Sequence, residues 1–353
     1  MTAERPESFD DRSVVVVGGA GFVGGNLVRM ILSGWPSARV LVIDNLLSSE
    51  RENVPKSPRV RFVKASITGA RALSLLDDGH DYIFHLATYH GNQSSIHDPL
   101  ADHENNTLTT LRLMNHVKGF RRLRKLVYSS AGCSVAEKTF GEAEATKEDA
   151  PLSLVQDSPY SISKVVGEFY SVYFHRQHGL PTVRARFQNV YGPGEILGAG
   201  RWRGTPATVW RNVTPTFVYK ALKGMPLPLE NDGVATRDFI HVDDVCRGLV
   251  ACALRGEPGD VYNLASGKET SIRDLAGAIN EMTGNSAGVL LLPRRPWDHS
   301  GRRFGSTEKA SGRLGFRASV GLREGLSGTI GWTRNNLELI ERCIGKHAEH
   351  MPL

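Results

Sequence analysis

The sequence predicts an α/β protein in which helices cover both faces of a parallel sheet. Two observations lead to this prediction: a strand-like run meets a glycine cluster at residues 13–26, SVVVVGGAGFVGGN, and strand-like segments then alternate with helical ones. The continuous β-branched run at 14–17 is typical of a strand that is buried on both faces. Alternating strands and helices indicate a doubly wound sheet, whose ligand binds at the carboxyl ends of the strands.

Five glycines follow the first strand, and three of them, Gly18, Gly21 and Gly24, have the spacing GxxGxxG. In a Rossmann-type sheet the first glycine permits a tight turn, the second lets the backbone approach a pyrophosphate, and the third lets the helix pack closely on its strand. The pyrophosphate then lies at a helix N-terminus, where free N–H groups and the helix dipole bind it. We therefore expect a dinucleotide to contact these glycines and the first helical residues, Phe22 and Val23.

The second strand, at 39–43, ends at Asp44, which is followed by Asn45. A carboxylate at this place accepts hydrogen bonds from the adenosine ribose and repels a 2′-phosphate, which favours NAD over NADP. The same rule places further cofactor contacts near the ends of later strands. They are Ser66 and Ile67 beside the adenine, Leu86, Ala87 and Thr88 beneath the pyrophosphate and nicotinamide ribose, and Asn105 in a helical segment, for which a solvated face is the alternative.

The length of 353 residues suits one large domain or two interlocked domains. The net charge of +6 is spread over scattered basic residues without an aromatic-interleaved stripe, so a small anionic substrate explains it better than nucleic acid. The cysteines at 133, 246, 252 and 343 form no CxxC pair and no metal-ligand spacing. Reduced thiols, together with the lack of an apolar segment of membrane-spanning length, predict a cytoplasmic enzyme without a metal or a membrane partner.

Residues 158–164, SPYSISK, predict the start of a helix, because Ser158 can cap it and Pro159 suits its first position. Tyr160 and Lys164 are four residues apart and therefore share one face of this helix. The ammonium group, the helix dipole and an oxidised nicotinamide would together lower the pKa of the phenol. Tyr160 is thus the expected base that removes a proton from a substrate hydroxyl.

The YxxxK pattern is common, and Tyr219 and Lys223 match it as well. They lie in a Pro-flanked segment away from the predicted cofactor half, so we expect them to be structural. Only Tyr160 follows a dinucleotide-binding fold at the appropriate place in the chain.

With GGAGFVGG, IDNL, HLA, VYSSAG, YSISK and RFQNVYGPGE in this order, the chain resembles the extended short-chain dehydrogenase/reductase family over nearly its whole length. The resemblance is to its NAD-dependent nucleotide-sugar epimerases and dehydratases. It implies a tightly held NAD, commonly a homodimer, and a catalytic set that falls here on Ser130, Tyr160 and Lys164. Ser129 is the alternative serine, because the Val-Tyr-Gly ending that most relatives carry is missing. Related 3,5-epimerases place a catalytic cysteine near Cys133, although a small core residue is the favoured interpretation.

The resemblance also implies which residues of the C-terminal part bind the nucleotide sugar. These are Asn189, Arg237, Arg295 and Asp298, while Gln188 takes the family's position beside the nicotinamide. Because the family's chain crosses between its halves, we expect an NAD-binding domain at 11–188 plus about 236–263. A smaller interleaved substrate domain then comprises 189–235 plus 264–345.

A segment between Gly194 and Val218 is longer than in the compact relatives and contains Arg201, Arg203 and Arg211. A solvated loop is the default interpretation. Because it follows a site-forming motif, its three arginines and two tryptophans are also candidates for recognition of an anionic or bulky sugar.

The predicted activity is NAD-dependent inversion of carbon 4 of a nucleotide sugar, a UDP-hexose or UDP-hexuronic acid, through a transient 4-keto intermediate. A 4,6-dehydratase or a decarboxylase is the alternative, but such relatives use acidic residues directly after the catalytic Ser/Thr, where Ala131 and Gly132 stand. A non-catalytic NAD-sensing protein is less consistent with the sequence, because it could dispense with Tyr160 and Lys164.

Overall fold

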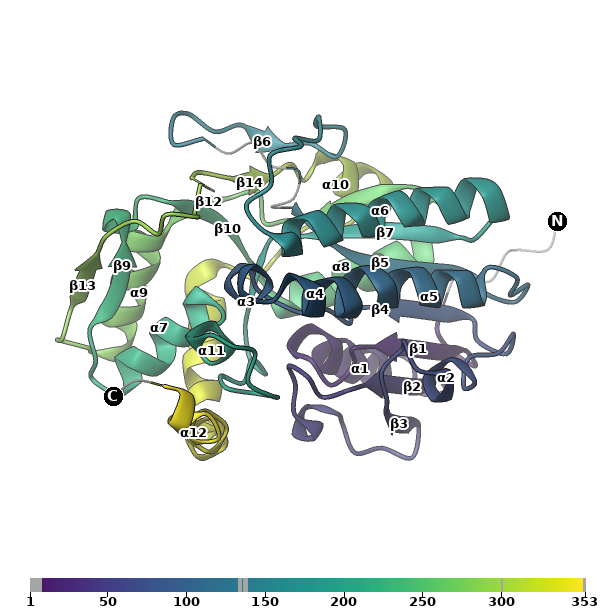
Figure 1. The fold of residues 1–353 in the computed structure, drawn as a ribbon, viewed down its shortest axis with the longest axis horizontal. Coiled ribbons are helices and arrows are strands. Elements are labelled where there is room, and N and C mark those ends of the chain that lie inside the picture. Colours follow the sequence, from purple (N-terminus) through teal and green to yellow (C-terminus); the bar gives the residue numbers. More distant parts are fainter. Residues whose placement is uncertain (1–7, 133–134, 136–138, 300, 352–353) are drawn as a thin grey trace.

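The structure, a computed structural model, describes residues 8–132, 135, 139–299 and 301–351. Seven parallel strands form the main sheet in the order β11-β7-β5-β4-β1-β2-β3 (Figure 1). The chain starts in the middle of this sheet and extends it in both directions, which confirms the predicted doubly wound fold. The strands are β1 (Ser13–Val17), β2 (Arg39–Asp44), β3 (Val60–Lys64), β4 (Tyr82–His85), β5 (Lys125–Ala131), β7 (Thr182–Phe187) and β11 (Val261–Leu264).

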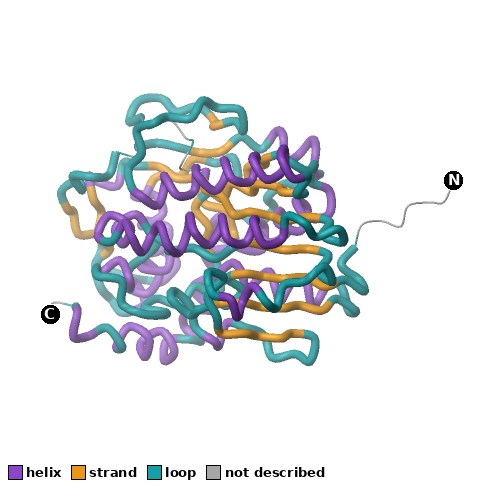
Figure 2. Tube along the Cα trace, turned by 45° about the vertical axis from the view of Figure 1, so that its right-hand side comes forward, coloured by secondary structure: helices purple, strands orange, loops and turns teal. Residues whose placement is uncertain are grey.

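Helices cover both faces of the main sheet, because alternate strand residues point to opposite faces. Val14 and Val16 pack on the side of α1 (Phe22–Gly34), α8 (Val242–Arg255) and α10 (Glu308–Leu314). Val15 and Val17 pack on the side of α2 (Ala70–Leu73), α5 (Leu108–Val117) and α6 (Pro159–His178). Figure 2 shows this second helical layer, in purple, lying across the orange strands. Within the described ranges, no helix has both the length and the apolar character needed to cross a membrane.

A smaller domain adjoins the main sheet and has a core of its own (Figure 1). Its three-stranded sheet has the order β12 (Glu269–Ser271), β10 (Thr236–His241), β8 (Asn189–Tyr191), and β13 (Val289–Leu292) pairs with β9 (Leu227–Glu230). Its core lies between α7 (Val213–Leu222), α9 (Ile272–Thr283) and α11 (Leu322–Asn335). The remaining elements are α3 (Asn92–His97), α4 (Pro99–Asp102), α12 (Leu337–Gly345) and the strand pair β6 (Ala145–Thr146) and β14 (Phe304–Gly305).

The chain passes between the two domains several times. After β7 it enters the smaller domain at β8, and β10 also belongs there because it pairs with β8 and β12. It then returns to the main sheet through α8 and β11. Residues 308–314, predicted as part of the smaller domain, form α10, which packs in the core on the α1 and α8 side of the main sheet.

The turn between β1 and α1 depends on two very close backbone approaches. Gly18 has φ of +88°, and a Cβ there would lie 2.5 Å from the backbone nitrogen of Ala87. A Cβ on Gly24 would lie 2.3 Å from the carbonyl oxygen of Gly18. The turn, the first helix and the loop after β4 can therefore meet at one point only because these positions lack side chains.

Gly24→Ala is expected to destabilise the protein by about 1–3 kcal/mol, because a methyl group at this place forces the helix away from the turn. Gly34→Ala is the matched control in the same helix, because a Cβ there meets no atom within 4 Å. This control should be neutral or stabilising by up to about 1 kcal/mol. Urea unfolding of both variants measures the difference, and equal stability of the two would contradict the packing argument.

Candidate active site

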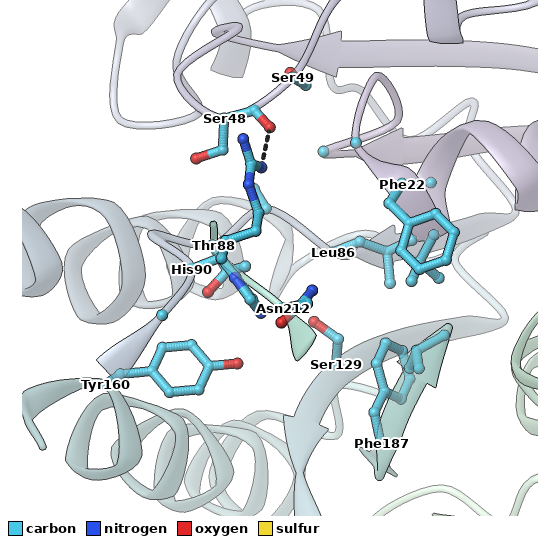
Figure 3. Close-up of a pocket in the computed structure, with 18 of the residues that line it drawn as sticks. Phe22, Ser48, Ser49, Leu86, Thr88, His90, Ser129, Tyr160, Phe187 and Asn212 are labelled. Atoms are coloured by element: carbon cyan, nitrogen blue, oxygen red, sulfur yellow. Dashed lines mark hydrogen bonds between the residues drawn. The ribbon is translucent and has the colours of Figure 1, made fainter. Parts of the chain in front are cut away.

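The carboxyl ends of the central strands open into a cavity of about 400 Å³ that the smaller domain borders (Figure 3). The predicted catalytic residues line it, and so does every residue predicted to contact the cofactor. The latter are Gly18, Gly21, Phe22, Val23, Gly24, Asp44, Asn45, Ser66, Ile67, Leu86, Ala87, Thr88, Asn105, Tyr160, Lys164 and Gln188.

The N-terminus of α1 faces this cavity without a side-chain cap. Gly21 is its N-cap and has no side chain with which to cap the helix, and its first turn contains no acidic residue. Gly18, Gly21 and Gly24 line the cavity at this point. The open N–H groups and the positive end of the helix dipole therefore fit the pyrophosphate of a dinucleotide.

The carboxylate of Asp44 lies at the end of β2 and ties the glycine turn to that strand. It accepts hydrogen bonds from the Ala20 N–H at 3.0 Å, the Leu46 N–H at 2.8 Å and the Ser49 hydroxyl at 2.9 Å. Burial raises the pKa of Asp44, and these hydrogen bonds oppose the shift because they stabilise the charged form. The side chain lines the cavity beside the turn, where the sequence places the adenosine ribose.

Tyr160 and Lys164 lie on the first turns of α6. Ser158 caps this helix by accepting a hydrogen bond from the Ser161 N–H at 3.2 Å, and Pro159 is its first residue. The Nζ of Lys164 lies 5.7 Å from the centre of the Tyr160 ring. The same ammonium donates a hydrogen bond of 2.9 Å to the carbonyl oxygen of Ser129. The capped helix start thus brings phenol, ammonium and the end of β5 together.

The hydroxyl of Ser130 donates a hydrogen bond to the buried ion pair of Glu168 and Arg186. It donates a hydrogen bond of 2.5 Å to Oε1 of Glu168, and Arg186 binds both oxygens of the same carboxylate at 2.8 and 2.9 Å. Burial alone would raise the pKa of Glu168, but the bonds from Arg186 outweigh burial and hold it below its ordinary value. Ser130 lines the cavity, yet its hydroxyl is committed to Glu168.

Ser129 points to the opposite face of β5, because strand residues alternate. Its hydroxyl donates to the carbonyl oxygen of His85 at 3.0 Å and keeps its lone pairs for another donor. Figure 3 shows the hydroxyls of Ser129 and Tyr160 directed toward one another. Ala131, the next residue on this face, carries no hydroxyl. Both serine hydroxyls therefore donate to acceptors within the protein, and Ser129 lies on the face of β5 opposite to the Glu168 ion pair.

The loop after β4 is held by the buried amide of Asn106, which lies in a π-helical turn at 103–107. Its oxygen accepts hydrogen bonds from the Tyr89 N–H at 2.6 Å and the Thr88 hydroxyl at 2.9 Å. Its nitrogen donates to Asp102 at 2.7 Å and to the Ser163 hydroxyl of α6 at 3.1 Å. One amide thus fixes the loop relative to the helix that carries Tyr160.

His90 follows in that loop and was not predicted. Its ring centre lies 5.9 Å from that of Tyr160 in an edge-to-face arrangement (Figure 3). Burial lowers the pKa of His90 to about 3, so the imidazole is neutral at physiological pH. Its Nδ1 is buried and has no hydrogen-bond partner in the described part of the chain.

The segment after β8 is largely a buried wall of the cavity, in contrast to the default interpretation as a solvated loop. Arg203 is 4% exposed, and Arg211 lines the cavity. Arg201 is exposed at the surface. Trp210, one of the two tryptophans of this segment, also lines the cavity, as do Glu195 and Asn212, which no local pattern marks in the sequence.

Two of the four predicted sugar-nucleotide residues line the cavity, namely Asn189 and Arg295. Arg295 lies 5.6 Å from the centre of the Trp297 ring and donates a hydrogen bond to Glu230. Arg237 is buried outside the lining, where it donates to the carbonyl oxygens of Thr236 at 2.6 Å and Gly301 at 2.8 Å. Asp298 also lies outside the lining, so both stay predictions. Cys133 lies outside the described residues.

Residues 14–265 match the family described as the NAD dependent epimerase/dehydratase family. The chain belongs to this family. NAD is the cofactor, in agreement with Asp44 and the open N-terminus of α1, and when bound it fits the Gly18 to Gly24 turn.

Curated relatives of similar length include both epimerases and dehydratases. The chain is 32% identical to a UDP-glucose 4-epimerase of Mycolicibacterium smegmatis, with coverage of 91% of this chain and 98% of that one. It is 30% identical to a dTDP-glucose 4,6-dehydratase of Streptomyces antibioticus, with coverage of 92% and 93%. Among solved structures, the Bordetella bronchiseptica enzyme WbmF in complex with NAD+ and UDP has a TM-score of 0.87 and 63% identity, with coverage of 97% and 98%.

Proposed function

We propose that the protein is an NAD-dependent epimerase that inverts carbon 4 of a nucleotide sugar, a UDP-hexose or UDP-hexuronic acid. The observation that carries the proposal is the meeting of Tyr160, Lys164 and Ser129 at the end of β5 in the cofactor cavity. The similarity to a UDP-glucose 4-epimerase and to an enzyme crystallised with NAD+ and UDP supports the nucleotide sugar.

The residues suggest a division of tasks at the sugar's 4-hydroxyl. The cavity would hold NAD, whose nicotinamide would supply a reversible hydride acceptor for carbon 4. Tyr160 takes the hydroxyl proton and gives it back after the 4-keto sugar has turned over. Lys164 lies close enough to Tyr160 to stabilise the phenolate, and Ser129 can hydrogen-bond the same substrate oxygen. Oxidation and reduction at one carbon cancel, so no external oxidant is needed.

The alternative, a 4,6-dehydratase or decarboxylase, needs an acidic side chain after the catalytic Ser/Thr. Ser130 and Ala131 follow Ser129, and Ala131 and Gly132 follow Ser130, so no acidic residue stands directly after either serine. A Cβ on Gly132 would lie 2.2 Å from the side-chain nitrogen of Gln188, so a side chain at this place would have to displace that amide. The cavity therefore contains groups for hydride and proton exchange at carbon 4, but the acidic residue that relatives use for the loss of water is not at its expected position.

Tyr160→Phe should abolish turnover and leave nucleotide binding nearly intact, because it removes a proton acceptor and little packing. Tyr219→Phe is the matched control, since Tyr219 packs on Trp210 and Lys223 pairs with Glu341 at 2.7 Å. NMR analysis of products from UDP- and dTDP-sugars tests the reaction itself. A carbon-4 epimer is expected, and a 4-keto-6-deoxy product would overturn the epimerase proposal.

Replacement of each serine by alanine should distinguish a catalytic role from a structural one. Ser129→Ala is expected to lower kcat by roughly tenfold to a thousandfold, because a substrate hydrogen bond is lost. Ser130→Ala should keep kcat but lower stability by about 1–3 kcal/mol, because Glu168 loses a buried donor. Steady-state kinetics and thermal unfolding give both quantities. The reverse outcome would restore Ser130 as the catalytic serine.

We further propose that the protein is a homodimer joined through the outer side of α6. Ile162, Phe169 and Tyr173 are 51%, 58% and 52% exposed, and their spacing of seven and four residues places them on one side of the helix. Large apolar side chains that line up in this way on a surface are typical of an interface.

Phe169→Glu combined with Tyr173→Glu should convert the dimer to a monomer, because it places charges in an apolar interface. Leu154→Glu is the control, since Leu154 is 97% exposed in a loop outside α6. Light scattering coupled to size-exclusion chromatography measures the mass of each variant. A monomeric wild type, or a double variant that remains dimeric, would contradict the proposed interface.

A further inference from the structure

Arg211, which lines the cavity, and Arg203, which is buried in the same segment, have N–H groups that no described residue satisfies. Arg211 donates hydrogen bonds to the carbonyl oxygens of Ser48 at 2.8 Å and Ala199 at 2.7 Å, but its Nε has no partner. Arg203 donates to the Ser48 hydroxyl, while its Nε and Nη2 lack partners. Buried guanidinium groups are normally paired or fully hydrogen-bonded. The unsatisfied donors therefore indicate a missing anionic ligand.

The charges around these arginines do not balance within the protein. Glu195 is the carboxylate of the same wall, and its Oε1 accepts a hydrogen bond from Asn212 while its Oε2 is buried without a partner. Burial raises the pKa of Glu195 to about 7, so this group is only partly ionised at neutral pH. Burial and the neighbouring Arg211 lower the pKa of Arg203 to about 9, which still leaves it charged at neutral pH. Two guanidinium groups thus face Glu195, which is only partly ionised, and Glu50, which already pairs with Lys346.

The position of the cluster points to the sugar end of the substrate. The charges of Arg211 and Arg203 both contribute to the lowered pKa of His90, after burial. His90 lies against the Tyr160 ring, and the Arg203 guanidinium lies 5.7 Å from the ring centre of Tyr89, the preceding residue. Because Tyr160 acts on carbon 4 in the proposed reaction, groups beside His90 border the hexose. The unpartnered Nδ1 of His90 adds a further polar contact there.

The wall is held in place before any substrate binds. His347 hydrogen-bonds the carbonyl oxygen of Gly198 at 2.9 Å, and Trp202 stacks on His350 with ring centres 4.8 Å apart. The N–H of Gly200 donates to Glu50 at 2.9 Å, which ties the same segment to the cofactor domain. The arginines therefore meet a ligand with little loss of conformational freedom, which favours tight binding.

We propose that Arg203 and Arg211, with His90 beside them, form a subsite for a carboxylate on the sugar, so that the substrate is a nucleotide hexuronic acid. The inference rests on the proposed function, because the assignment of the sugar end depends on Tyr160. A carboxylate accepts hydrogen bonds from a guanidinium in parallel, and such charge-assisted pairs are among the strongest polar contacts in proteins. The diphosphate of the same substrate is the other anion that could occupy this place.

Kinetics with UDP-glucuronic acid and UDP-glucose separate the two anions, because both substrates carry the diphosphate and only one carries the carboxylate. The wild-type holoenzyme should prefer UDP-glucuronic acid in kcat/KM by about tenfold to a hundredfold. Arg203→Gln and Arg211→Gln should each reduce this ratio at least about threefold. Arg201→Ala is the control, because this arginine is exposed at the surface, and it should leave the ratio unchanged.

Two outcomes would overturn the subsite. Equal kcat/KM values for both sugars in the wild type would show that the carboxylate is not recognised. Parallel losses with both sugars in the two variants would assign the arginines to the diphosphate. Neither result would affect the proposed epimerisation, provided that both sugars give carbon-4 epimers.

Calorimetry of the Tyr160→Phe holoenzyme with UDP, UDP-glucose and UDP-glucuronic acid tests the subsite without turnover or changes in the wall. Tighter binding of UDP-glucuronic acid than of UDP-glucose is expected, and equal affinities would contradict the proposal. This measurement does not depend on catalysis. If the protein epimerises none of the sugars, the proposed function is wrong, but the binding data still show whether the carboxylate subsite exists.

Discussion

The close backbone contact between Gly18, Gly24 and the loop after β4 is the constraint on which the rest of the site depends. The first helix can lie directly on the turn because Gly24 has no side chain, and the turn can touch Ala87 because Gly18 has none. Asp44 then ties β2 to the same turn through the Ala20 N–H. Three strand ends and one helix start therefore border a single cavity, and the helix presents its open N–H groups to it.

The cofactor half of the site could be predicted from the sequence because its signals are local or follow from topology. Gly18 to Gly24 and Asp44 are identified by spacing alone, and the ends of later parallel strands must lie at the same edge. Tyr160 and Lys164 share a helix face four residues apart, and the structure brings both to the cavity. These predictions required only the periodicity of a helix and the parallel direction of the strands.

The serine could not be settled in this way, because its orientation depends on partners far along the chain. Ser130 is held by Glu168, 38 residues later, and Glu168 is held in turn by Arg186. That ion pair draws one hydroxyl toward α6, and the alternation of the strand leaves Ser129 on the other face. His90 escaped prediction for the same reason, and Arg211 was only one of three candidate arginines, because contacts far along the chain rather than local patterns place them.

The buried arginines show how the fold can maintain an arrangement that is unfavourable without a ligand. A guanidinium with unpaired N–H groups in a buried wall lowers stability, so the surrounding structure must hold it there. Contacts from the end of the chain do so: His347 binds Gly198, and Ile340 and Cys343 pack on Ile196 and Leu197. In the proposed enzyme, binding of an anionic sugar would recover this free energy. The same excess of positive charge beside the sugar then both lowers the stability of the unliganded protein and selects an anionic sugar.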